Sequence, residues 1–179
     1  MSSEFESDLA GGHPNSLGNT VPVAERVNAD RSLVDELIQT YSSDDEVVRL
    51  RVSSVLKRVA LEHPEWVHER LEVIEEWVAH WKQPSAQWSL AEMYRTLTGL
   101  LTRDQYDNAV AVMKGHLASS TDWIVINHTL ETLAQWARSD DELREWLIPE
   151  LWRYSDETRK SIAGKARRWI GKLDTRGLS

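Results

Sequence analysis

Four stretches of this sequence resemble one another and begin about 35 to 39 residues apart. Each carries apolar residues at helical spacing, and a second apolar helix-like stretch separates it from the next. Helix pairs that recur at this period cannot bury their apolar faces alone, so neighbouring pairs must stack into a continuous core. The repeat therefore predicts an all-α stacked array, and the four stretches are residues 45–60, 84–101, 121–137 and 155–173.

Residues that favour helix starts divide the array into individual helices. Ser43 precedes Glu46 by three residues, the spacing of a capping box, and Ser139 precedes Glu142 in the same way. Two further N-cap candidates are Asp30 and Ser155. The predicted helices span residues 20–28, 31–42, 44–62, 64–82, 84–101, 103–118, 121–138, 140–153 and 155–173.

The start of the first repeated stretch carries a family resemblance. Residues 45–52 read Asp-Glu-Val-Val-Arg-Leu-Arg-Val, which resembles the HEAT pattern of Asp, two residues, Val-Arg, two residues and a small apolar residue. Residues 155–163 are a looser copy. The chain is also similar to small bacterial HEAT-repeat proteins at residues 13–18, 43–49, 62–65, 87–93 and 166–168. One departure is Gln87-Trp88, where that family would have Arg-Trp.

The resemblance covers about residues 13–173 and implies a fold but no activity. The fold it implies is a right-handed α-α superhelix, a HEAT or armadillo-like solenoid of about four helix pairs. Residues 1–19 would then be an irregular N-terminal segment, 20–173 the repeat domain and 174–179 a short tail. By the same resemblance, Asp45, Arg49 and Arg159 are structural ladder residues that join neighbouring repeats.

Solenoids usually bind partners on the concave face, which the inner helices of the repeats line. We expect the repeated stretches to be those inner helices and their non-core residues to point into that face. Trp88 and Trp123 stand near two helix starts and are candidate anchors, because Trp is enriched at binding hot spots. They could instead wedge between helices. The other partner-binding candidates are Arg51, Arg95, Asn127 and Glu131.

Composition and motifs favour a protein without enzymatic activity. The chain has no Cys, so thiolate catalysis and Cys-ligated metals are excluded. Its six His show no metal-binding spacing, and the acidic clusters at 44–46 and 140–142 fall in first helical turns, where carboxylates favour the helix dipole. No nucleophile motif or phosphate loop occurs. We therefore predict no catalytic residue, metal or cofactor.

Charge is distributed unevenly along the chain, whose net charge is −8. Residues 1–82 account for all of it, whereas residues 155–179 carry seven basic and three acidic residues. The last helix either caps the array or contacts an acidic partner, including another copy; its basic residues are Arg159, Lys160, Lys165, Arg167, Arg168 and Lys172. The acidic total disfavours nucleic acid.

The expected partner is a protein, and the expected state is a monomer or a weakly self-associating chain. No signal peptide and no apolar run of membrane-spanning length are evident, which favours the cytoplasm. Two alternatives stay open. One is a DNA-binding helical-repeat protein related to the glycosylases of alkylated bases, for which Asp122 and Trp123 are the candidate residues. The other is an accessory subunit of a neighbouring enzyme.

Overall fold

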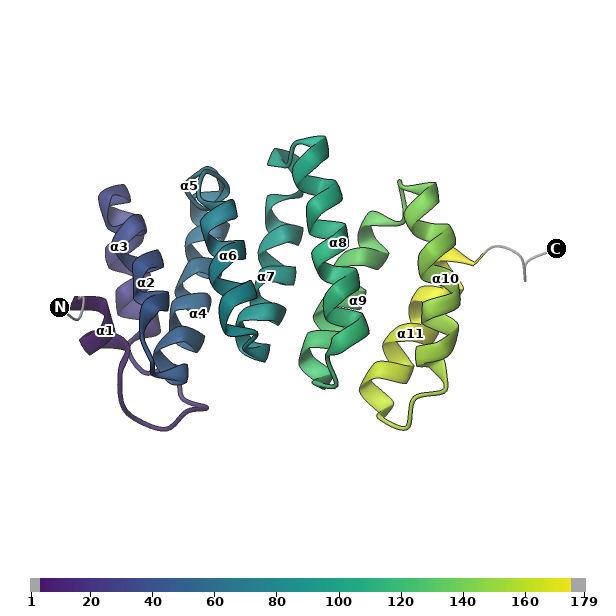
Figure 1. The fold of residues 1–179 in the computed structure, drawn as a ribbon, viewed down its shortest axis with the longest axis horizontal. Helices are drawn as coiled ribbons and strands as arrows, with labels where there is room; N and C mark the ends of the chain where they lie inside the picture. Colours follow the sequence, from purple (N-terminus) through teal and green to yellow (C-terminus); the bar gives the residue numbers. More distant parts are fainter. Residues whose placement is uncertain (1–3, 175–179) are drawn as a thin grey trace. The chain divides into compact units, whose positions relative to one another are not determined.

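The computed structural model describes residues 4–174, and over that range the chain is helical without a strand (Figure 1). The all-α prediction is confirmed for these residues. The α-helices are α1 (Glu4–Leu9), α2 (Thr20–Ala29), α3 (Val34–Gln39), α4 (Glu46–Glu62), α5 (Pro64–His68), α6 (Leu71–Trp81), α7 (Pro84–Leu97), α8 (Arg103–Ser119), α9 (Trp123–Trp136), α10 (Asp141–Ser155) and α11 (Lys160–Leu173). Three 3-10 turns complete the helical structure, at Arg31–Leu33, Thr40–Ser42 and Thr98–Leu100.

The helices form two compact units, where the sequence predicted one repeat domain over residues 20–173. The amino-terminal unit ends at Arg103, and the carboxy-terminal unit begins at Asp104, inside the first turn of α8. In the amino-terminal unit α4 packs between α2 and α7. In the carboxy-terminal unit α11 packs against α9 and α10. Each unit has its own buried apolar side chains, which is why each is compact by itself.

The buried side of α4 follows directly from the spacing of its apolar residues. Val48, Val52, Val55, Leu56 and Val59 recur at intervals of three and four, which places them on one face of a helix. All five are completely buried. The apolar stripe therefore sets which face of α4 turns toward its neighbours.

The caps of α4 and α10 are aspartates, and the predicted serine caps at Ser43 and Ser139 are wrong. Asp45 Oδ1 accepts a hydrogen bond of 2.8 Å from the Val47 amide, so α4 begins at Glu46. Asp140 caps α10 in the same way through the Leu143 amide. A carboxylate both accepts from the free amides and adds a negative charge at the positive end of the helix dipole.

The predicted helix start at Ser155 is also wrong. Ser155 is the last residue of α10, and its hydroxyl donates to the Trp152 carbonyl at 2.7 Å. α11 begins only at Lys160, after a turn in which Glu157 pairs with Arg159. A serine that hydrogen-bonds back to the preceding turn ends a helix rather than starting one.

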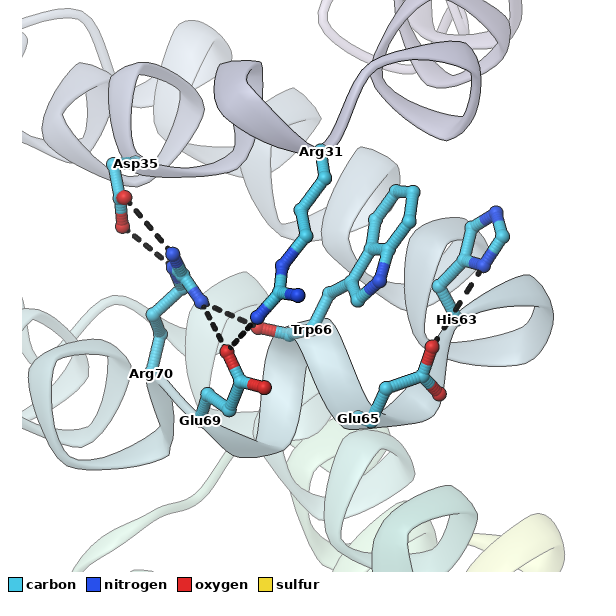
Figure 2. A network of polar contacts seen from close by, with 7 residues as sticks. All are labelled: Arg31, Asp35, His63, Glu65, Trp66, Glu69 and Arg70. Carbon is cyan, nitrogen blue, oxygen red and sulfur yellow. Dashed lines mark hydrogen bonds and ion pairs between the residues drawn. The ribbon is translucent and has the colours of Figure 1, made fainter.

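The predicted helix over residues 64–82 is interrupted at Glu69 and Arg70, between α5 and α6. Figure 2 shows that these two side chains reach the segment around α3. Arg70 forms a bidentate ion pair with Asp35, at 2.6 and 2.9 Å, and Glu69 pairs with Arg31. The hydrogen bonds from these arginines lower the pKa of the Asp35 and Glu69 carboxyls. The interruption between α5 and α6 thus places an ion-pair network between residues 69–70 and residues 31–35. These ion pairs are exposed to solvent, where such pairs add little stability.

The amino-terminal segment is more ordered than the sequence predicted. The sequence predicted an irregular segment over residues 1–19, but residues 4–9 form α1. Phe5 and Leu9 on this helix are fully buried, and the Arg26 guanidinium of α2 lies 5.0 Å from the centre of the Phe5 ring. The burial of these two side chains offsets part of the conformational entropy that is lost when the short helix becomes ordered.

Arg51 holds the loop that follows α1. Its side chain is 1% exposed, and its two terminal nitrogens donate to main-chain carbonyls of residues 9, 11, 13 and 16, at 2.6 to 3.3 Å. Gly18 closes this loop with a φ of 50°. A Cβ atom at Gly18 would lie 2.8 Å from the Arg51 Cζ atom, so only glycine fits there.

Replacing Arg51 should destabilise the amino-terminal unit and release its first segment. We expect Arg51→Met to lower the free energy of unfolding by about 2–4 kcal/mol, because four buried carbonyls lose charged donors. The loop over residues 10–19 should also become sensitive to limited proteolysis. Urea denaturation and protease digestion measure the two effects, with Arg153→Met at an exposed arginine as the control. An unchanged midpoint together with an uncut loop would contradict this role.

The cap assignment is tested by two neighbouring aspartates. Asp45→Ala should lower the free energy of unfolding by about 1 kcal/mol, the usual cost of losing an N-cap side chain. Asp44→Ala, one residue earlier and exposed, should have almost no effect. Equal losses for the two variants in urea denaturation would show that α4 is capped differently.

Candidate functional site

The six predicted partner-binding residues divide between the two units. Arg51, Trp88 and Arg95 belong to the amino-terminal unit, and Trp123, Asn127 and Glu131 belong to the carboxy-terminal unit. Arg51 is buried under the segment after α1, so its prediction as a partner-binding residue is wrong. The sequence missed this because it treated residues 1–19 as irregular and left nothing to cover the Arg51 side of α4.

Trp88 and Arg95 lie along a line of charged side chains between α4 and α7, here called the α4–α7 seam. Lys57 of α4 reaches across it, with Nζ 2.7 Å from Glu92 Oε2 and 4.1 Å from the centre of the Trp88 ring. Trp88 is half-buried. The members of the seam are Lys57, Arg58, Trp88, Glu92 and Arg95.

Positive charge exceeds negative charge at the α4–α7 seam. Burial lowers the pKa of the Lys57 ammonium; Glu92 opposes this change, and the charges of Arg58 and Arg95 add to it. The Arg95 Nη1 atom is buried without a hydrogen-bond acceptor among the described residues. Glu92 and Arg95 follow Trp88 at four and seven residues, so helical spacing alone would have placed them on the Trp88 face.

Trp123, Asn127 and Ser161 form a second surface, here called the Trp123 face. Trp123 opens α9 and is 51% exposed. Asn127, one turn later, donates from Nδ2 to the Trp123 carbonyl at 2.9 Å and to Ser161 Oγ at 3.4 Å. Asn127 is only 7% exposed, and its Oδ1 atom has no donor among the described residues. Nothing in the sequence pattern identified Ser161.

Glu131 is bound within the protein. Its carboxylate accepts from Arg168 at 2.6 Å and from the Trp169 indole at 3.2 Å, and it lies 3.2 Å from the Lys165 ammonium. Burial alone would raise the pKa of Glu131, but hydrogen bonds from Gln135 and Trp169 and the Lys165 charge outweigh burial and lower it to about 2. Glu131 therefore links α9 to α11, and both of its carboxylate oxygens accept hydrogen bonds within the protein.

The three ladder residues lie at helix starts. Arg49 donates to Gln83, just before α7, at 2.8 Å and to the Ser43 carbonyl at 2.6 Å. Arg159 donates to the Thr121 carbonyl, just before α9, at 2.6 Å. Asp45 caps its own helix and forms no ion pair with a neighbouring segment in the part of the chain that the structure describes. The two arginines thus connect consecutive repeated stretches, whereas Asp45 acts locally.

Most of the basic charge of the last helix is used inside the carboxy-terminal unit. Lys165 and Arg168 pair with Glu131, and Arg167 donates to the Ser155 carbonyl at 2.8 Å. Lys172 lies 4.8 Å from the centre of the Trp169 ring. These residues therefore do not form a uniformly basic contact surface on α11.

Other chemistry has few candidates in the part of the chain that the structure describes. No group of three metal-ligating side chains occurs there, and none of its helices is both long and apolar enough to cross a membrane. Asp122, the acidic residue of the glycosylase alternative, accepts from the Ile124 and Val125 amides as the N-cap of α9. Comparisons of the chain with protein-family models, curated proteins and solved structures returned no match.

Glu131 predicts an acid-sensitive link in the carboxy-terminal unit. Its folded-state pKa of about 2 lies below the ordinary value of 4.5, so its contribution is complete above pH 4.5 and is lost as the pH falls toward 2. Glu131→Gln should cost about 1–2 kcal/mol at pH 7 and much less near pH 2. Thermal unfolding followed between pH 2 and 7 measures this, and a cost that is independent of pH would contradict it.

Proposed function

We propose that this chain is a non-enzymatic protein-binding module of the HEAT-repeat type, and that the Trp123 face is part of its binding surface. The observation that carries the proposal is the half-exposed Trp123 beside a fixed amide that lacks one partner. Large exposed aromatic side chains mark binding surfaces when polar groups rim them.

The Asn127 side chain has a fixed orientation on the Trp123 face. Both hydrogen bonds from Nδ2 hold the amide plane, so Oδ1 has a defined orientation. Oδ1 is buried, so a partner N–H would reach it only by displacing the side chains that cover it, and that contact would remove the cost of a buried acceptor without a donor. Trp123 and Asn127 are one turn apart on the same side of α9, so one extended segment of a partner could contact both.

Polar contacts at a regular sequence separation support the repeat assignment. Arg49 and Gln83 are 34 residues apart, and Asn127 and Ser161 are also 34 apart. Arg159 and Thr121 are separated by 38 residues. Helix-pair repeats place equivalent helices in contact at a separation of about 33 to 47 residues, with HEAT and armadillo repeats at about 40 to 47, so these separations support a helix-pair repeat in general. The expected setting is a cytoplasmic monomer that works on its own or as the accessory subunit of another protein.

The proposal is tested by placing a photo-crosslinking amino acid at position 123 in cells. We expect a discrete protein crosslink from position 123, because that side chain projects from the proposed surface. Trp152 is a matched control, since it is 52% exposed on α10 of the same unit but donates its indole N–H to Asp174. Position 152 should give no crosslink to the same partner.

Recovery of the crosslinked partner by tryptophan variants and a DNA-binding control complete the test. Trp123→Ala should reduce recovery of the crosslinked partner at least about tenfold, and Trp152→Ala should leave it unchanged. A gel shift on duplex DNA at low salt examines the glycosylase alternative. Identical crosslinks from both positions, or DNA binding that Trp123→Ala abolishes without any protein partner, would overturn the proposal.

A further inference from the structure

The carboxy-terminal unit contains a partly open hollow of about 240 Å³ with a basic lining. Arg138 lies in the turn after α9, Arg144 near the start of α10, and Lys172 with Leu173 in the last turn of α11. Three cationic side chains from three segments of the chain therefore converge on one small volume. The sequence pattern singled out neither Arg138 nor Arg144 as a binding residue, and it named Lys172 only among the basic residues of the last helix, because the three are far apart in the chain.

Helix dipoles explain only two of these three cations. Arg138 and Lys172 stand at the C-terminal ends of α9 and α11, where positive charge is favourable. Arg144 stands near the N-terminal end of α10, where the dipole disfavours it. Among residues 4–174 its side chain pairs only with Asp141, three residues earlier and 81% exposed, so that ion pair is weak. The position of Arg144 is best explained by a negative charge that it meets in the hollow.

The acidic groups around the hollow leave an excess of positive charge. Asp141 pairs with Arg144 at the edge, and Asp174 accepts the Trp152 indole N–H at 3.1 Å. Among the described residues, the Arg138 side chain forms no ion pair, and Lys172 contacts only the Trp169 ring. Arg138 and Lys172 thus lack carboxylate partners within residues 4–174.

We propose that the Arg138–Arg144–Lys172 hollow binds a phosphate group, carried either by free phosphate or by a small phosphate monoester. Phosphate is compact, doubly charged near neutral pH and matches the planar donor fork of arginine. The hollow is smaller than the cavities that enclose drug-sized ligands. Leu173 supplies an apolar wall where the organic part of a monoester would rest.

Calorimetric titration of the full chain at low ionic strength tests this site, with inorganic phosphate and glycerol phosphate as the two probes. We expect saturable binding with one site per chain. The Arg138→Ala/Lys172→Ala variant should bind at least about tenfold more weakly, because both unpaired cations are lost. Lys160→Ala removes one charge from an exposed position at the other end of α11 and should change the affinity less than twofold.

Two further variants distinguish a specific phosphate-binding site from non-specific attraction of phosphate to positive charge. Asp141→Asn should tighten phosphate binding, because it frees Arg144, whereas Glu142→Gln on the same turn should not. Tighter binding of glycerol phosphate identifies the monoester as the ligand, and equal binding identifies the free ion. The proposal is overturned if neither probe binds saturably, or if Lys160→Ala weakens binding as much as the Arg138→Ala/Lys172→Ala variant does, each variant retaining its helical circular dichroism.

Discussion

The Arg51 guanidinium is buried without a carboxylate, and its charge is compensated by four main-chain carbonyls of one short loop. A buried charge is costly unless hydrogen bonds compensate it, and here the two terminal nitrogens of Arg51 supply them, so the loop and the helix depend on each other. The position of α1 follows from this, because the chain between Leu9 and Gly18 must wrap around one side chain. The apolar contacts of Phe5 and Leu9 then complete the end of the amino-terminal unit.

Polar links of the same kind recur where one repeated stretch meets the next. Arg49 and Arg159 each reach an acceptor that precedes a neighbouring helix, and Glu131 gathers several donors from α11. These contacts fix the register of helices whose apolar faces alone would permit sliding. Lys165, Arg167 and Arg168 of the last helix likewise have partners within the fold, so these three residues do not form a free basic surface.

Candidate functional residues are therefore found by asking which polar groups lack a hydrogen-bond partner among the described residues. Of the predicted binding residues, Trp123 keeps a large exposed area, and Asn127 keeps an acceptor without a donor. Arg95 keeps a buried nitrogen without an acceptor at the α4–α7 seam. The hollow near Arg138 is different in kind, since no motif pointed to it and only the meeting of three helix ends creates it.

The sequence by itself determined the helical class, most helix positions and the buried stripe of α4, because capping residues and apolar spacing act within a few residues of each other. It also identified Arg49 and Arg159 as residues at the joints between repeated stretches. Only the tertiary structure decided that Arg51 and Glu131 are occupied, that Asp45 rather than Ser43 caps α4, and that Arg138, Arg144 and Lys172 meet. The Asp45 cap is a local contact with the Val47 amide that the capping-box spacing assigned to the wrong residue. The other outcomes depend on contacts between residues far apart in the chain, for which local spacing carries no information.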